Sequence, residues 1–379
     1  SGGANCSASV SQFIADAFRG DVLAEFPNID GIVPIWHGTG CGCSGSDENF
    51  EILMNTIAGY VRHPNFARVL IVGLGCEVLQ IDTLLKNRQL TENQNFQTMT
   101  IQGTGGTRKT VREGIRRIQA WLPQANVVDR RAVPAKHLIL GLQCGGSDGY
   151  SGITANPALG AAVDLLVRHG GTAILGETPE IYGAEHLFTR RAISTEVGEK
   201  LIERIHWWEN YTKAHHAEMD NNPSPGNKEG GLTTILEKSL GAAAKGGTTN
   251  LVEVYRFAQP VGARGLVFMD TPGHDPVSLT GMVAGGANLI CFSTGRGSVY
   301  GCKPVPVTKL ATNTEMYTRL EDDMDINCGE TIDGAATVAE MGERIFRFIL
   351  EVAGGKKTKS ELNGLGDNEF VPWFMGAVM

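Results

Sequence analysis

The sequence lacks the features that mark several large classes of protein. No apolar run approaches the roughly 18 residues that a membrane-spanning helix needs, so we expect no membrane span. An excess of positive charge is also missing: the net charge is −8 and the pI is near 5.6. Lys and Arg are scattered rather than clustered. We therefore expect neither nucleic acid nor an anionic membrane as a partner.

Cysteine is too sparse for a disulfide-rich scaffold, since 8 cysteines are spread over 379 residues. The first residues contain no basic segment followed by an apolar one, so no signal peptide is predicted. We therefore expect free thiols in a reducing cytoplasm. The CxxC clusters that would make a metal or cluster site a strong prediction are missing. A Walker sequence and a strand-to-helix G-x-G-x-x-G with a following acid are also missing, which argues against a nucleotide site.

Glycine, by contrast, is abundant at 49 residues, and much of it follows apolar runs. Such runs alternate with segments of helical periodicity, which predicts an α/β fold with parallel or mixed sheets flanked by helices. The polar, proline-bearing segment 129–136 predicts a boundary between a smaller α/β domain, residues 1–135, and a larger catalytic domain, residues 136–379. Because ligands bind beyond the carboxyl ends of parallel strands, we expect the active site there, between the domains.

Three cysteines share one local context, at the end of an apolar run that enters a glycine-rich turn. They are Cys41 in HGTGCG, Cys76 in GLGCE and Cys144 in LQCGGSD. Thiols so placed could be metal ligands or nucleophiles, or simply small buried residues. Three thiolates could hold a soft metal or an iron–sulfur cluster, and Glu77 beside Cys76 adds a hard oxygen ligand that suits iron(II) or manganese(II). His37 is a candidate ligand or acid–base group.

Polar groups crowd three further stretches. GETPEIYGAEH places Glu177, Glu180 and Glu185 around a predicted strand end, where carboxylates could bind a metal or hydroxyl groups, or could be solvated. The loop NNPSPGNKEGG presents donors suited to a carboxylate or to several hydroxyls. The candidate substrate-binding residues in this loop and in the CGGSD turn are Asn222, Ser224, Asn227, Lys228, Ser147 and Asp148. Asp148 could instead cap the following helix.

Two more loops supply an acid–base group and an anion clamp. His274 in TPGHD is a candidate general base, and Arg296 in STGRG could bind a carboxylate through two parallel hydrogen bonds. Lys228 could also act as a base if it is desolvated.

Taken in order, HGTGCG, GLGCE, CGGSDGYSGITANP, ETPEIYGAEH, NPSPGNKEGG, TPGHD and STGRG resemble the altronate/galactarate dehydratase family. The resemblance covers nearly the whole chain, and CGGSD with NPSPGNK is specific. It implies an iron(II)- or manganese(II)-dependent hydro-lyase that converts a hexonate or hexarate to a 2-keto-3-deoxy acid. In that family a small N-terminal domain often precedes this region, so a separate subunit carrying that domain is a candidate partner.

On this view Cys41, Cys76, Cys144 and Glu77 are the expected metal site. His37, Lys228 and His274 are the expected catalytic residues. A related branch eliminates sulfite from sulfolactate, and Cys41 and Cys76 disfavour it. A cysteine hydrolase using Cys144 with His274 and a non-catalytic sugar-acid-binding subunit remain alternatives. A homo-oligomer is the default expectation.

Overall fold

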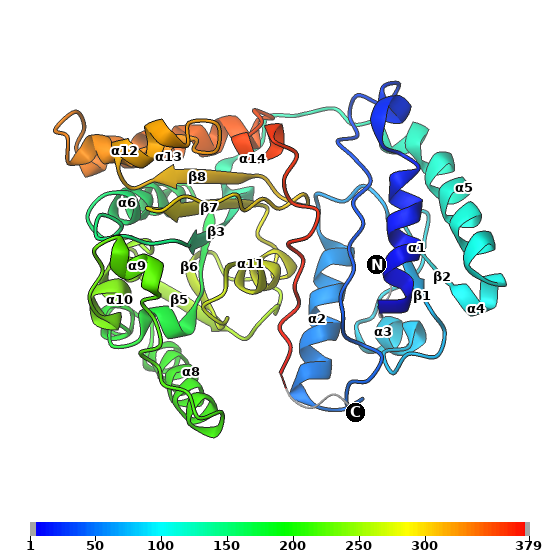
Figure 1. Cartoon of the computed structure of the whole chain (residues 1–379), viewed down its shortest axis with the longest axis horizontal. Coiled ribbons are helices and arrows are strands. Elements are labelled where there is room, and N and C mark those ends of the chain that lie inside the picture. The colour runs from blue at the N-terminus through cyan, green and yellow to red at the C-terminus, as the bar shows by residue number, and fades with distance from the viewer. Residues whose placement is uncertain (1–4, 376–379) are drawn as a thin grey trace. The chain divides into compact units, whose positions relative to one another are not determined.

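The computed structural model describes residues 5–375 and divides the chain into two compact units (Figure 1). Unit 1 comprises Ser1–Ala132 with Phe370–Met379, and unit 2 comprises Val133–Glu369. The chain therefore enters unit 2 once and returns to unit 1 at its end. Within the described residues, no helix combines the length and the apolar character needed to cross a membrane.

Unit 1 is built on a two-stranded parallel sheet of β1 (Val69–Gly73) and β2 (Phe96–Thr100). Helix α5 (Thr107–Ala125) buries Thr110, Gly114, Ile118 and Leu122, which recur every four residues and so share one face. A Cβ on Gly114 would lie 2.4 Å from Ile14 Cδ1, so glycine lets α5 approach α1 closely. The other helices of unit 1 are α1 (Asn5–Asp16), η1 (Gly20–Leu23), α2 (Glu48–Arg62), α3 (Ile81–Asn87) and α4 (Ile101–Thr104).

The end of the described chain packs within unit 1. The rings of Phe370 and Tyr60 have centroids 4.6 Å apart, and the Met375 amide donates to Asn49 Oδ1 at 3.0 Å. Residues 370–375 therefore pack against the core of the unit in which the chain began.

Unit 2 contains a seven-stranded, fully parallel sheet in the order β5-β6-β4-β3-β7-β8-β9. The predicted α/β fold with parallel sheets is confirmed. Strand β3 lies at the centre and pairs with both β4 and β7, so its carboxyl end has loops on either side. The strands are β3 (Ile139–Cys144), β4 (Thr172–Leu175), β5 (Leu251–Tyr255), β6 (Gly265–Met269), β7 (Leu289–Thr294), β8 (Val307–Ala311) and β9 (Ile326–Asn327).

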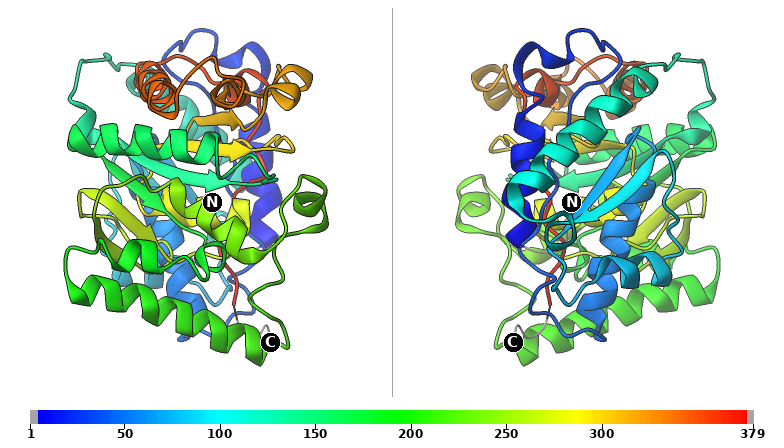
Figure 2. Two further views of the ribbon diagram at one scale, coloured as in Figure 1. Left: turned by 90° about the vertical axis from the view of Figure 1, so that its left-hand side faces the viewer. Right: turned by 90° about the vertical axis from the view of Figure 1, so that its right-hand side faces the viewer.

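The core of unit 2 joins alternate residues of these strands to the helices. Leu140 and Leu142 of β3 belong to one apolar cluster with α6 and α13. In both views of Figure 2, α8 runs along the lower edge of unit 2. The helices are η2 (Ala135–His137), α6 (Ala155–Arg168), η3 (Thr178–Ile181), α7 (His186–Thr189), α8 (Thr195–Ala214), α9 (Pro225–Glu229), α10 (Ile235–Ala244), α11 (Asp275–Ala284), α12 (Thr314–Arg319), η4 (Cys328–Thr331), α13 (Val338–Ala353) and α14 (Lys359–Leu362).

One helix is shorter than its pattern predicts. Apolar periodicity indicates a helix over 196–220, but α8 ends at Ala214. His215 caps the helix, and His216 has a φ of +55°, which no α-helix can continue through. The residues that follow instead begin the connection that carries Asn222 to the site.

Candidate active site

The predicted strand end at Cys144 is the centre of the candidate site. Cys144 is the last residue of β3 and is 2% exposed. Glycine must follow it, because a Cβ on Gly145 would lie 2.3 Å from Asp275 Oδ2 and 2.7 Å from the ring of Phe292. The bare backbone of CGGSD therefore lets a neighbouring carboxylate and ring approach the strand end.

Two buried carboxylates meet the thiol of Cys144. Its Sγ lies 4.0 Å from Glu177 Oε2 and 3.7 Å from Glu180 Oε2. Both glutamates follow β4, whose end neighbours that of β3 in the parallel sheet. We call Cys144, Glu177 and Glu180 the acid cluster. Within residues 5–375 it is the one group of three or more acidic, thiol or imidazole side chains close enough to share a metal ion.

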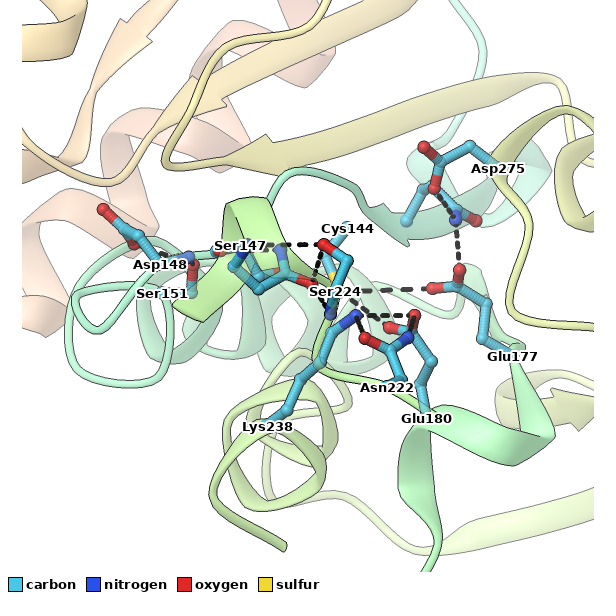
Figure 3. Close-up of polar contacts among 12 residues, drawn as sticks. Cys144, Ser147, Asp148, Ser151, Glu177, Glu180, Asn222, Ser224, Lys238 and Asp275 are labelled. Carbon is cyan, nitrogen blue, oxygen red and sulfur yellow. Dashed lines mark hydrogen bonds and ion pairs between the residues drawn. The ribbon is translucent and has the colours of Figure 1, made fainter. Parts of the chain in front are cut away.

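Two lysines supply positive charge to the acid cluster. Lys245 Nζ lies 2.8 Å from Cys144 Sγ and 3.5 Å from Glu177 Oε2. Lys238 Nζ donates to Glu180 Oε1 at 2.8 Å and to Asn222 Oδ1 at 2.9 Å. Lys238 lies in α10 and Lys245 caps its end, seven residues and thus about two turns later, so both face the cluster. We call them the lysine pair. Figure 3 shows Lys238, Asn222 and Glu180 converging beside Cys144.

The side-chain amide of Gln143, on the opposite face of β3, extends the hydrogen-bond network of the acid cluster. Gln143 Nε2 donates to Glu177 Oε1 at 2.5 Å and to Asp275 Oδ1 at 2.7 Å. Glu177 has a φ of +64°, a conformation that glutamate rarely adopts. Its amide is fixed by Thr271 Oγ1 at 2.7 Å. Strained backbone of this kind concentrates at functional sites, where the surrounding structure enforces it.

Burial dominates the electrostatics of the site. Desolvation raises the pKa of Cys144 to about 12 and that of Asp275 to about 6. Desolvation and the neighbouring charge of Glu180 raise the pKa of Glu177 well above its ordinary value. Burial alone would lower the pKa of Lys245, but the charges of Cys144 and Glu177 outweigh burial and raise it. The charged ammonium form of Lys245 is therefore favoured in this site.

A second group of loops lies beside the acid cluster. Asn227 Nδ2 donates to the carbonyl of Ser147 at 2.8 Å, and the Gly149 amide donates to the carbonyl of Gly230 at 2.8 Å. The CGGSD turn is thus tied to the NPSPGNKEGG segment. Ser147 Oγ is buried and has no hydrogen-bond partner in the structure. Substrate binding by Ser147 stays a prediction.

Asp148 organises these loops. Its carboxylate accepts hydrogen bonds from Thr312 Oγ1, Asn313 Nδ2 and Ser151 Oγ at 2.9–3.0 Å. A Cβ on Gly295 would lie 2.0 Å from this carboxylate, so glycine is needed there. Asp148 does not cap the following helix α6, whose N-cap residue is Thr154, so the capping alternative is wrong. Direct substrate binding by Asp148 stays a prediction.

The remaining predicted residues of unit 2 lie nearer the surface. Ser224, Lys228, His274 and Arg296 are exposed. Ser224 caps α9 and bonds Asn227 Oδ1, while Arg296 Nη2 lies 3.3 Å from Glu229 Oε2. His274 precedes α11, whose first residue is Asp275. Their assigned roles stay predictions.

The other predicted residues belong to unit 1. The loops of Cys41 and Cys76 are neighbours, since the Leu79 amide donates to the carbonyl of Gly40 at 3.1 Å, and both thiols are exposed. Glu77 is buried, and its carboxylate accepts the amides of Leu74 and Gly75. It therefore stabilises its own turn.

His37 is buried in the same unit. Its Nδ1 lies 3.0 Å from Thr39 Oγ1, and its Nε2 has no partner in the structure. Desolvation lowers the pKa of His37 to about 4, so the imidazole is neutral near pH 7.

Sequence reasoning missed the lysine pair and Gln143. The signal for the lysines was present: in ILEKSLGAAAK, Lys238 and Lys245 are the only basic residues, and they stand two turns apart on a segment of small and apolar residues. A charged position on the buried face of a helix indicates a buried partner. For Gln143, the alternation of side chains along a strand predicts which face of the sheet the side chain lies on, but it does not predict its hydrogen-bond partners.

A parallel sheet with ionisable side chains gathered at its strand ends defines an α/β protein of enzymatic type. The family model described as D-galactarate/altronate dehydratase, C-terminal, matches residues 135–378. The model described as D-galactarate dehydratase/altronate hydrolase, second domain, matches residues 3–126. The chain belongs to the D-galactarate/altronate dehydratase family, a family of hydro-lyases, as the resemblance implied.

Named relatives support this assignment. Galactarate dehydratase (L-threo-forming) of Escherichia coli is 40% identical over 93% of this chain and 69% of its own length. Altronate dehydratase of Bacillus subtilis is 34% identical over 88% of this chain and 66% of its own. The chain thus spans about two thirds of these relatives. The (2R)-sulfolactate sulfo-lyase subunit beta of Chromohalobacter salexigens is 29% identical over 91% of this chain and 87% of its own.

Proposed function

We propose that the protein removes water from a sugar acid, galactarate, altronate or a related hexarate or hexonate, to give a 2-keto-3-deoxy acid. The observation that carries the proposal is the acid cluster with its lysine pair, in a chain 34–40% identical to galactarate and altronate dehydratases. Acidic and basic groups held together in a water-poor site suit a reaction that moves one proton away from carbon and another to a leaving oxygen.

The reaction needs three contributions from the protein. A base takes the proton next to the substrate carboxylate, and His274 or Lys228 is the proposed base. Positive charge stabilises the enediolate that forms, and Arg296 would bind the carboxylate from the exposed side, joined by Lys228 when His274 is the base. The β-hydroxyl then leaves as water, taking a proton from an acid. His37 is the residue expected to assist this departure, but its low pKa suits a base or a hydrogen-bond acceptor better.

The expected iron(II) or manganese(II) ion fits these residues poorly. Both oxygens of Glu77 already accept backbone amides, and Cys144 contacts the ammonium of Lys245. We therefore derive no step through a metal ion. Cys41 and Cys76 keep exposed thiols on neighbouring loops, and metal or cluster binding there stays a proposal.

The direct test is an assay of the purified protein under anaerobic conditions with galactarate and with altronate, measuring the 2-keto-3-deoxy acid. Turnover of either substrate supports the proposal, and Arg296→Lys should raise KM more than it lowers kcat if Arg296 binds the substrate carboxylate. Absence of keto acid from both substrates and from related hexonates would refute it.

A second candidate is supported by the sulfo-lyase relative. Its name identifies one subunit, and this chain spans 87% of it. We therefore propose a second polypeptide as a partner of this chain, and we include sulfolactate in the assay. Release of sulfite without keto acid from sugar acids would favour this candidate, whereas ligand binding without turnover would favour a binding subunit.

A further inference from the structure

The acid cluster requires a counter-charge, and the fold supplies one from within the chain. Glu177, Glu180 and Cys144 are each at most 4% exposed, so water cannot stabilise a negative charge on them. Lys245 is 1% exposed and Lys238 is 7% exposed, and each contacts a member of the cluster. The positive charge in this site therefore comes from two lysine side chains of the protein itself, one in α10 and one at its C-cap.

A metal ion would need the same donor atoms. A thiolate and two carboxylate oxygens within 4.8 Å of one another could bind a divalent transition metal. Lys245 Nζ, however, contacts two of these three atoms, Cys144 Sγ and Glu177 Oε2. Lys238 Nζ contacts the other oxygen of Glu180. Two ammonium groups thus compete with a metal ion, both for lone pairs and by charge repulsion.

We propose that Lys245, assisted by Lys238, is the resident cation of the acid cluster, and that Cys144, Glu177 and Glu180 bind no metal ion while Lys245 is in place. The inference goes beyond the proposed function, which does not say which group neutralises the negative charge of the acid cluster. It also gives α10 a specific role, because this helix and its cap place two fixed positive charges at the strand ends.

Cobalt(II) tests the proposal, because a bound thiolate produces a charge-transfer band in the near ultraviolet. Wild type, Cys144→Ser, Lys245→Met and the double variant would each be titrated anaerobically, with bound cobalt counted by elemental analysis. Lys309→Met is the matched control. Lys309 is another fully buried lysine of unit 2, its Nζ has no hydrogen-bond partner in the structure, and its charged neighbours are Asp323, Asp325 and Glu369.

We expect wild type and Cys144→Ser to give the same spectrum, since Cys144 binds no cobalt in either. Lys245→Met should gain one cobalt per chain with a thiolate band, and Cys144→Ser in that background should abolish it. Lys309→Met should match wild type. Cobalt bands from Cys41 or Cys76 would be common to all variants and would not affect the comparison.

Two results would overturn the proposal. One is a thiolate band in wild type that Cys144→Ser removes, because the cluster would then bind metal with Lys245 present. The other is a folded Lys245→Met that gains no cobalt, because Lys245 would then not be what excludes the metal. If Lys245→Met does not fold, the comparison of wild type with Cys144→Ser still decides the first point. Keto-acid production bears only on the proposed function, so the two proposals fail independently.

Discussion

Replacing Lys238 by methionine should destabilise unit 2 far more than the loss of an ordinary ion pair. Lys238 and Glu180 are 2.8 Å apart, with side chains only 7% and 5% exposed. Removing one partner of a buried pair leaves an unpaired buried charge, which costs about 3–5 kcal/mol. Because about 1 kcal/mol lowers the Tm of a domain of this size by ~2–4 °C, the unit 2 transition should fall by on the order of 6–20 °C.

The comparison that isolates the effect uses a second lysine and a second substitution. Lys200→Met removes a pair with Glu253 of similar length, 2.7 Å, whose side chains are 48% and 28% exposed, and should cost about 0–1 kcal/mol. The double variant Lys238→Met/Glu180→Gln should recover most of the loss, because no unpaired charge remains. Denaturant and thermal unfolding measure all four proteins. Equal losses in Lys238→Met and Lys200→Met would show that the pair is not effectively buried.

Two further predictions concern the CGGSD turn and unit 1. Gly145→Ala should lower the unfolding free energy by about 1–3 kcal/mol and reduce turnover, because the new Cβ would overlap Asp275 and Phe292. Gly226→Ala is the control, since the nearest atom to its new Cβ is 4.0 Å away. Equal stability of the two variants would contradict the reasoning. His37 should make unit 1 less stable as pH falls from 6.5 towards 4, because its pKa is lowered to about 4 in the folded state and the unfolded chain binds the proton first. Unfolding of wild type and His37→Gln between pH 4 and 8 tests this, and parallel pH profiles would refute it.

The sequence predicted the alternation of strands and helices because apolar runs and helical periodicity are local properties. It predicted β1, β3, β4, β6 and β7, each of which enters a loop with a recognisable polar pattern. It did not predict β2, β5, β8 or β9. LVEVY in β5 is a short segment interrupted by Glu253, and VTKLA in β8 contains Lys309, which is buried although its type is usually exposed. Their strand state depends on neighbours that pattern alone does not supply.

For the site, the sequence located strand ends but not the pairing of side chains across them. Glu177 and Glu180 were recognised as candidates, yet their contact with Cys144 depends on the adjacency of β3 and β4, which is a tertiary fact. Lys245 reaches Cys144 across a separation of 101 residues. Contacts over such distances require the topology, which the local context of a residue does not supply.

The composition of the acid cluster is itself an argument about function. Replacing a buried ion pair by well-packed apolar residues often leaves a protein equally stable or more stable, so stability alone does not explain why such groups occur at the ends of β3 and β4. Five ionisable side chains meet there, and Glu177 is held in a left-handed conformation that favours glycine. Buried ionisable side chains and an unfavourable backbone conformation occur together here. Such a combination is expected where residues are selected for chemistry rather than for packing. The lysine pair makes that explanation testable: if it is present for the reaction, Lys245→Arg should preserve the fold while impairing turnover.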